Sequence, residues 1–257
     1  MGVDYALFER LCDLAQRFRP EGRTLMLGRH SFRVNNRFYR LYDRALRPVG
    51  LDATPRDLEQ EDGYCERLMA RLGFGDMESM DFSDYEGAGI LHDLNRPVPE
   101  ELEGQFGMIF DGGTIEHVFN VPMALENVFR MLRPGGRFVS ANGMNGWIVH
   151  GMYQFNPELV WTYWGRGCGC KVHDCRGIPT VPRAETRHFP FEDPALTGRR
   201  IRLKRKGFPA GRVYLYYEIE RLPESRPTGT VLQSDYVTRW APHKTAAETR
   251  SRRTEDA

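Results

Sequence analysis

Apolar residues recur at helical spacing at the start of the chain. The repeat consists of Leu7, Leu11, Leu14 and Phe18. Because intervals of three or four residues bring side chains onto one helix face, the repeat predicts an amphipathic helix over residues 4–18. Pro20 ends it. We therefore expect an N-terminal helical extension over residues 1–22.

Short apolar runs that end in polar or glycine-bearing turns follow this helix. Such runs predict buried strands, and they cover residues 24–28, 78–82, 89–91, 108–110 and 137–141. The clearest helix between them spans 120–132 and is closed by the glycine turn before the next run. Strands that alternate with helices predict a parallel sheet.

The last part of the chain has a different pattern. Residues 199–206 and 212–219 predict two strands joined by a turn, and therefore an antiparallel edge. From residue 223 the apolar content falls, so we expect a largely disordered C-terminal tail over 223–257. The main domain is then expected at 23–222, with a helical insert at about 32–62.

Composition excludes several classes of protein. The 257 residues are 40% hydrophobic and 28% charged, which is typical of a globular chain. A formal charge of +1 argues against attraction of the whole chain to nucleic acid or an anionic membrane. The sequence has no apolar run of the roughly 18 residues that a membrane helix needs, and the charged N-terminal segment is unlike a signal peptide. We expect a cytoplasmic protein without a membrane anchor.

A cluster of possible zinc ligands occurs late in the chain: Cys168, Cys170, His173 and Cys175. Their types suit zinc, but structural zinc sites usually take paired ligands from two separated turns. The odd total of five cysteines also argues against a disulfide framework. We favour a loop of reduced, partly exposed cysteines and predict no metal-binding residues.

Polar residues follow each of the first four predicted strands. Gly28 and Arg29 follow the first strand, whereas Asp81, Asp93 and Asp111 lie at the ends of the next three. Ligands bind at the carboxyl ends of the strands in open parallel sheets. Three acidic strand ends and one basic turn should therefore surround one crevice.

The segment from Phe106 to Gly143 carries the most specific motif. A strand ending in aspartate, the pattern Asp-x-x-x-x-Glu-His, a crossover helix and Leu-Arg-Pro-Gly-Gly-Arg-Phe follow one another. This order resembles the class I S-adenosylmethionine-dependent methyltransferases, plausibly from Arg23 to Arg221. The resemblance implies an α/β fold, a Rossmann-like three-layer sandwich whose mostly parallel seven-stranded sheet has an antiparallel last strand.

The resemblance also implies S-adenosyl-L-methionine as cofactor. Asp81 would accept hydrogen bonds from the ribose hydroxyls, a task that suits an ionised carboxylate, while Asp93 would face the adenine amino group. Asp111 would lie beside the methionine part and the sulfonium, whose positive charge an acidic crevice favours. The full set of implied cofactor-binding residues is Gly28, Arg29, Asp81, Phe82, Asp93, Leu94, Asp111 and Gly112.

The loop after the first strand departs from the family pattern. An acidic residue followed by Gly-x-Gly-x-Gly is expected there, because absent side chains let the backbone approach the cofactor closely. Here Met26 replaces the acid and only Gly28 remains. Either Arg29 compensates by pairing with the cofactor's carboxylate, or the site has lost the cofactor.

Two histidines are candidates for a catalytic base on the acceptor side, His117 and His150. Histidine titrates near neutrality and can take a proton from a hydroxyl. Tyr153, Gln154 and Asn156 are candidate substrate contacts after the fifth strand. The alternatives are capping or packing histidines, and an aromatic-packed loop in which Asn156 caps the helix that starts at Pro157.

These features favour methyl transfer to a small-molecule or glycan-like acceptor. We favour oxygen as the acceptor atom, because the sequence has no nitrogen-type motif and offers two histidines. The basic run at 199–206 could hold phosphates, yet its alternation fits a half-exposed strand, so a nucleic-acid partner is not favoured. The main alternative is a non-catalytic binding or scaffold protein that has lost the cofactor, and a nicotinamide oxidoreductase ranks below both.

Overall fold

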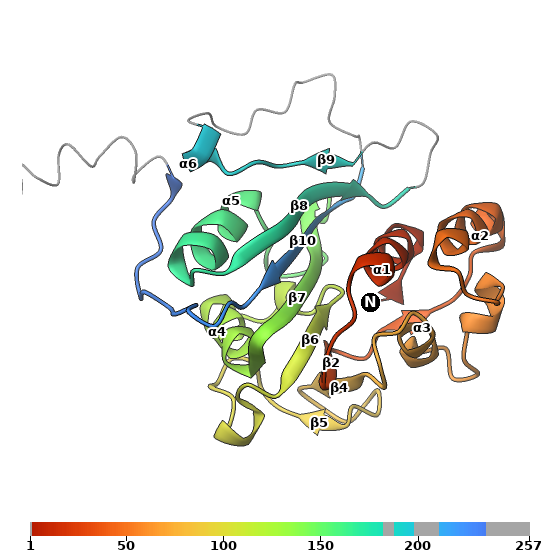
Figure 1. The fold of residues 1–257 in the computed structure, drawn as a ribbon, viewed down its shortest axis with the longest axis horizontal. Coiled ribbons are helices and arrows are strands. Elements are labelled where there is room, and N and C mark those ends of the chain that lie inside the picture. Colours follow the sequence, from red (N-terminus) through yellow and green to blue (C-terminus); the bar gives the residue numbers. More distant parts are fainter. Residues whose placement is uncertain (1, 182–187, 198–210, 235–257) are drawn as a thin grey trace, which may run out of the picture.

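The computed structural model describes residues 2–181, 188–197 and 211–234. Their main feature is an eight-stranded sheet with the order β5-β4-β2-β6-β7-β10-β8-β9 (Figure 1). Its strands are β2 (Arg23–Leu27), β4 (Glu78–Asp81), β5 (Ile90–Leu91), β6 (Phe106–Asp111), β7 (Leu132–Asn145), β8 (Lys171–Pro179), β9 (Phe189–Pro190) and β10 (Val213–Glu220). Two further short strands, β1 (Gly2–Val3) and β3 (Ser31–Phe32), pair with each other.

The direction of the strands confirms the Rossmann-like α/β prediction. All neighbouring pairs from β5 to β7 are parallel, whereas β10 runs antiparallel to both β7 and β8. The expected number of strands was wrong, because the described residues form eight, the extra one being the short strand β9. Two of the described strands are reversed: β10 lies between β7 and β8, and β9, which is antiparallel to β8, forms the edge of the sheet.

The pairing of the last strands corrects a second expectation. We expected residues 199–206 to pair with the strand after them, but that segment lies outside the described residues. Instead, β10 pairs with β8 (Lys171–Pro179) on the side away from β7. The cysteine-containing segment that we predicted as a loop is thus mostly a strand of the sheet.

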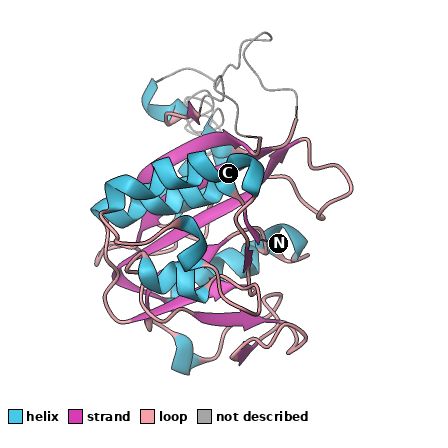
Figure 2. Ribbon diagram, turned by 90° about the vertical axis from the view of Figure 1, so that its right-hand side faces the viewer, coloured by secondary structure: helices cyan, strands magenta, loops and turns pink. Residues whose placement is uncertain are grey.

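Helices cover both faces of the sheet (Figure 2). The α-helices are α1 (Tyr5–Arg17), α2 (Tyr39–Leu46), α3 (Glu66–Arg71), α4 (Val121–Met131), α5 (Pro157–Leu159) and α6 (Pro194–Thr197), and a π-helix, η6 (Val160–Gly167), continues α5. The 3-10 helices are η1 (Asn36–Phe38), η2 (Arg47–Val49), η3 (Pro55–Leu58), η4 (Glu100–Leu102) and η5 (Ile115–His117). Part of the predicted helical insert is therefore helical.

Local capping explains where the two longest α-helices begin. The side chain of Asp4 accepts a hydrogen bond from the Leu7 amide and caps α1. Asn120 caps α4 in the same way through the amide of Met123, and a proline occupies the first turn. Both helices then bury an apolar stripe against the sheet.

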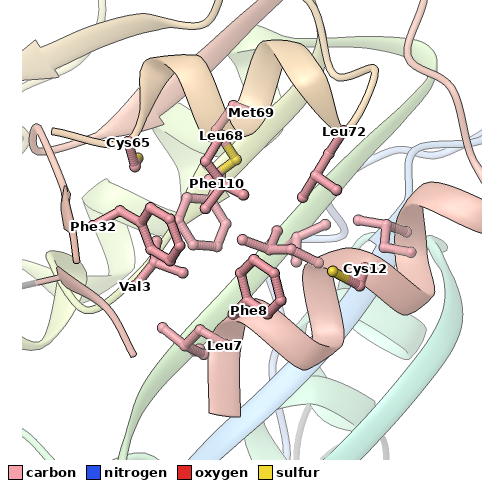
Figure 3. Packing of buried hydrophobic residues seen from close by; sticks show 14 of the residues in the cluster. Val3, Leu7, Phe8, Cys12, Phe32, Cys65, Leu68, Met69, Leu72 and Phe110 are labelled. Atoms are coloured by element: carbon pink, nitrogen blue, oxygen red, sulfur yellow. The ribbon is translucent and has the colours of Figure 1, made fainter. Parts of the chain in front are cut away.

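Two apolar clusters lie on opposite faces of the sheet. Met26 and Phe110 belong to the cluster that includes α1 and α3 (Figure 3), whereas the adjacent residues Leu25 and Ile109 belong to the cluster that includes α4. Successive side chains of a strand point to opposite faces. The mostly apolar strands β2 and β6 are thus buried on both sides, as a three-layer sandwich requires.

The beginning of the predicted tail packs against the domain. Ser225 is buried, and its hydroxyl donates a hydrogen bond to the carbonyl of Gly169. The amide of Ser234 donates to the carboxylate of Glu158. Residues 235–257 lie outside the described part, so disorder there stays a prediction. In the described ranges, no helix is both long and apolar enough to cross a membrane.

Candidate active site

The chain changes direction across the sheet beside β2. It adds β4 and β5 on one side of β2 and then returns to add β6 and β7 on the other. Ligands bind at the carboxyl ends of the strands at such a switch point. The loops after β2, β4, β6 and β7 therefore define the region in which to look for a site.

The loop after β2 requires glycine at its first position. Gly28 has a φ of 71°, in the left-handed region that favours glycine. A Cβ atom on Gly28 would lie 2.6 Å from Oγ1 of Thr114. That hydroxyl donates a 2.6 Å hydrogen bond to the carbonyl of Leu27. Gly28 thus allows the loop after β6 to lie directly against β2.

His30 strengthens the same connection. Its side chain is buried, and its Nε2 accepts a 3.1 Å hydrogen bond from the amide of Gly112. The ring also packs edge-on against Phe110. Direct contacts between two loops therefore occupy the place where the family pattern has further glycines. The cofactor role of Gly28 and Gly112 stays a prediction.

Arg29 already has several partners. Its guanidinium pairs with the carboxylates of Glu66 and Asp62, the latter at 2.8 Å, and it donates a 3.0 Å hydrogen bond to the carbonyl of Glu86. It also stacks over the ring of Tyr64 at 3.8 Å. The basic turn is thus tied to α3 and its preceding loop, and its pairing with a cofactor carboxylate remains a prediction.

Asp111 organises the loop that follows β6. It is fully buried, and its Oδ1 accepts hydrogen bonds from the amides of Gly113 and Thr114 at 3.2 and 2.7 Å. Its Oδ2 accepts from Ser140 Oγ and from Asn142 Nδ2, at 3.1 and 2.6 Å. A buried carboxylate needs such donors. In this structure, Asp111 therefore holds the loop against β7.

Asp81 is the acidic strand end with unused hydrogen-bonding capacity. Its Oδ1 accepts a 2.6 Å hydrogen bond from the amide of Phe82, and Oδ2 accepts none from the described residues. The carboxylate is half-buried, whereas the Phe82 ring is exposed. An oriented carboxylate with a free oxygen fits a ligand hydroxyl group.

Asp93 shapes the turn after β5. Its Oδ1 accepts hydrogen bonds from the amide and the side chain of Asn95, which lower the pKa of the Asp93 carboxyl. Leu94 is buried, and Nδ2 of Asn127 donates to its carbonyl. Contacts with adenine at Asp93 and Leu94 stay predictions.

The two candidate histidines converge on one carboxylate. Nε2 of His150 lies 3.2 Å from Oε1 of Glu116, and Nε2 of His117 lies 3.8 Å from the same oxygen. The two imidazole rings meet edge to face, with 5.2 Å between their centroids. Residues separated by a strand and a loop thus form one group at the carboxyl edge of the sheet.

Glu116 is the residue of this group that our sequence reasoning passed over. It is 1% exposed, and burial raises the pKa of its carboxyl to about 7. Oε2 accepts a short hydrogen bond from the amide of Gly143, whereas the buried Oε1 accepts no hydrogen bond within the described residues. The signal in the sequence was the Glu-His pair itself, which does not reveal burial.

The loop that carries His150 is strained and braced. Val149 has a φ of 65°, an outlier for a β-branched residue, and functional sites are where such strain collects. Beside it, the ring of Trp147 packs 4.8 Å from that of His150. The Trp147 indole donates a 3.0 Å hydrogen bond to the carbonyl of Val213 on β10. The Trp147 ring against which His150 packs is therefore itself fixed to β10.

The three predicted substrate contacts also have structural partners. The hydroxyl of Tyr153 donates to the Phe119 carbonyl at 2.8 Å, and Oε1 of Gln154 accepts from the Trp147 amide at 3.2 Å. Asn156 caps α5, as the alternative interpretation expected. Contact of Tyr153, Gln154 or Asn156 with a substrate stays a prediction.

The late cysteine cluster is not gathered into a metal site. Only Glu116, His117 and His150 form a group of three or more possible ligands within the described part of the chain. Cys168, Cys170 and Cys175 are buried, in contrast to our expectation of partial exposure, and His173 pairs with Glu220 at 2.6 Å. Cys175 lies in β8, whereas Cys168 and Cys170 precede it, and all three pack into the apolar cluster that includes α4.

No protein-family model and no curated protein matches this chain. Similar solved structures include 1,6-didemethyltoxoflavin-N1-methyltransferase of Burkholderia thailandensis, with 13% identity, a TM-score of 0.44, and coverage of 86% of this chain and 80% of that one. A geranyl diphosphate methyltransferase has 13% identity, a TM-score of 0.42 and coverage of 85% of both chains. A 16S rRNA adenine methyltransferase of Catenulisporales acidiphilia has 14% identity, a TM-score of 0.37, and coverage of 83% and 93%. At these TM-scores none of them assigns a function to this chain.

Proposed function

We propose that the protein transfers a methyl group from S-adenosyl-L-methionine to a hydroxyl of a small-molecule or glycan-like acceptor. The proposal rests on two groups that lie at the same edge of the sheet. The first is the partly free carboxylate of Asp81 after β4, and the second is formed by Glu116, His117 and His150 beyond β6 and β7. The first suits a ribose diol, and the second suits deprotonation of an acceptor.

The residues on the acceptor side have separate roles in the reaction. Methyl transfer is an in-line displacement, so orienting the acceptor and excluding water contribute most. S-adenosyl-L-methionine, when bound, supplies the methyl group as an activated sulfonium. A neutral imidazole of His150 or His117 accepts the hydroxyl proton, and burial lowers the pKa of both rings. Glu116 then stabilises the imidazolium.

Exposed apolar side chains near the histidines support an acceptor with an apolar part or a sugar face. Ile148 and Val149 immediately precede His150, and Phe119 and Met152 follow His117 and His150 along the chain; all four are largely exposed. Apolar atoms around a few polar groups are typical of small-molecule sites.

Calorimetric titration of S-adenosylmethionine and S-adenosylhomocysteine tests the cofactor half of the proposal. We expect the wild type to bind both, and Asp81→Asn to bind roughly ten-fold or more weakly, since a hydrogen bond to a charged group contributes about 1.5–3 kcal/mol. His150→Ala should bind the cofactor like the wild type but lose turnover in an acceptor screen. Absence of binding by the folded wild type overturns the proposal.

Arg29→Ala resolves the role of the basic turn in the same titration. A loss of about ten-fold or more supports pairing of Arg29 with the cofactor's carboxylate. Unchanged affinity excludes that pairing and leaves Arg29 as the link between the first loop, Glu66 and Asp62.

A second candidate function is a binding protein that no longer uses the cofactor. The observation that favours it is the closed contact between the loops after β2 and β6, made by His30 with Gly112 and by Thr114 with Leu27. This candidate predicts no heat of binding for either cofactor form. Cofactor binding that depends on Asp81 rejects it.

A further inference from the structure

Three side chains at the carboxyl edge of the sheet combine into a ligand set. Glu116 offers one carboxylate oxygen, and His117 and His150 each offer one ring nitrogen; the three atoms lie within 4.8 Å of one another. Imidazole and carboxylate groups bind divalent transition metals, and two histidines with one glutamate form a known type of catalytic zinc site. We propose that Glu116, His117 and His150 bind one divalent transition-metal ion.

The distances fit this assignment. Metal bonds of about 2.0–2.2 Å in a tetrahedral site hold the ligand atoms roughly 3.3–3.6 Å apart. Oε1 of Glu116 lies 3.2 Å from Nε2 of His150 and 3.8 Å from Nε2 of His117. The two imidazole nitrogens lie within 4.8 Å of each other, so the three atoms would move together by about 1 Å at most to bond one ion.

The carboxylate of Glu116 has an oxygen that is available to a cation. Its Oε1 is buried and accepts no hydrogen bond from a described residue, which is costly for a group of this kind. The opposite oxygen is fixed by the amide of Gly143, and the backbone carbonyl of Glu116 accepts from the amides of Met152 and Tyr153. Such supporting bonds orient metal ligands. Glu116 thus directs its unsatisfied oxygen toward the two imidazoles.

Two glycines lie directly against Glu116. A Cβ atom on Gly143 would lie 3.0 Å from Oε2 of Glu116 and 2.8 Å from Cγ of Trp147. A Cβ atom on Gly151 would lie 2.9 Å from the carbonyl oxygen of Glu116. Both glycines therefore lie tightly around the acidic ligand, while Trp147 packs behind His150.

The site is open on the side of the histidines. The side chain of His117 is 46% exposed and that of His150 is 25% exposed, whereas Glu116 is buried. Three protein ligands leave at least one coordination position vacant, as in catalytic sites. Resting on the proposed function, the ion would bind the acceptor hydroxyl and lower its pKa, replacing a histidine as the means of deprotonation.

Direct metal binding tests the assignment without any need for activity. The full chain, purified without a histidine tag and stripped with a chelator, is titrated with Zn²⁺ and Co²⁺ by calorimetry, and Co²⁺ is also followed by its visible absorption. We expect one equivalent of each ion to bind. Glu116→Gln, His117→Ala and His150→Ala should each weaken binding at least ten-fold, while His188→Ala, whose ring pairs with Glu9, should not.

The outcomes separate the metal site from the methyltransferase proposal. Metal binding that depends on the three residues supports the site even if no cofactor binds. Absence of saturable binding overturns it, and so does binding that survives all three substitutions. Circular dichroism establishes that each variant is folded, and the half-exposed His117 gives an informative variant should His150→Ala not fold. Binding of Mg²⁺ but of neither Zn²⁺ nor Co²⁺ overturns the assignment to a transition metal.

Discussion

Nε2 of His30 lies 3.1 Å from the amide nitrogen of Gly112, so a buried imidazole joins the loop after β2 to the loop after β6. These loops flank the switch point of the sheet, where a Rossmann-like fold binds its ligand. This hydrogen bond holds the loop after β2 against the loop after β6. The same contact bears on whether a cofactor enters there.

His30→Ala should destabilise the protein by about 1–3 kcal/mol, because it leaves the Gly112 amide without its acceptor in a buried place. Urea denaturation gives the free energy of unfolding. His92→Ala is the matched control, since the partly exposed His92 ring makes its hydrogen bond to the carbonyl of Arg96 near the surface, and it should change stability by no more than about 0.5 kcal/mol. Equal losses for the two variants would contradict a special role for His30.

Gly143→Ala should disturb the Glu116 group more than the fold as a whole. The new methyl group would press on both Oε2 of Glu116 and the Trp147 ring. We expect Co²⁺ affinity to fall at least ten-fold in the absorption titration. Gly165→Ala serves as control, because a Cβ atom there has no neighbour closer than 3.9 Å. Retained affinity in Gly143→Ala would show that the carboxylate tolerates displacement.

The strands of the parallel half of the sheet were predictable because their signal is local. A strand buried on both faces, such as Thr24–Leu27, is a short apolar run that ends in a turn residue, and nothing distant in the chain changes that pattern. Helix α4 combines a cap, a proline and an apolar stripe in one segment. Fold class and most element positions follow from such signals.

The residues that were missed depend on distant contacts. Strand β8 has few apolar residues and no regular alternation of polar and apolar positions, and its pairing with β10 and β9 makes it a strand. Likewise, Glu116 is polar in sequence, and its burial beside Gly143 and His150 depends on contacts that are distant in the chain. The candidate histidines were found from their position, but their common partner was not.

Arg17 should be important for the attachment of α1. Its guanidinium pairs with the fully buried carboxylate of Glu218 on β10, which also accepts a 2.6 Å hydrogen bond from the Tyr216 hydroxyl. Arg17→Ala should lower the free energy of unfolding by roughly 3 kcal/mol in urea denaturation, because it leaves the buried carboxylate with Arg137, 3.8 Å away, as its remaining ion-pair partner among the described residues. The double variant Arg17→Ala, Glu218→Gln should recover part of that loss. No recovery would mean that packing of the Arg17 stem, and not charge, explains the effect.

The five cysteines should be unreactive in the native protein. All are buried and free, and burial raises the pKa of Cys12, Cys65 and Cys168 to about 12 and that of Cys170 to about 11. The thiolate is the reactive form, so an aromatic disulfide reagent near neutral pH should find no fast thiol. All five should react after denaturation. One rapidly titrated thiol in the folded protein would contradict this burial.

The ion pair between β2 and β4 should give a small pH-dependent contribution to stability. Arg23 contacts both carboxylate oxygens of Glu78, at 2.8 and 2.9 Å, and this hydrogen bonding lowers the pKa of Glu78. A carboxyl whose pKa is lower in the folded state contributes stability that is complete above its unfolded pKa and is lost as pH falls through the folded pKa. Both side chains are partly exposed, so the contribution should stay below about 1 kcal/mol.

Urea denaturation of the wild type and Glu78→Gln measures that contribution. The wild type should be more stable near neutral pH, and the difference should shrink as pH falls through the lowered pKa of Glu78 and vanish once the carboxyl is protonated. Arg23→Gln should give the same pattern, because either change removes the pair. A difference that is independent of pH would show that Glu78 acts through its shape in the strand and not through its charge.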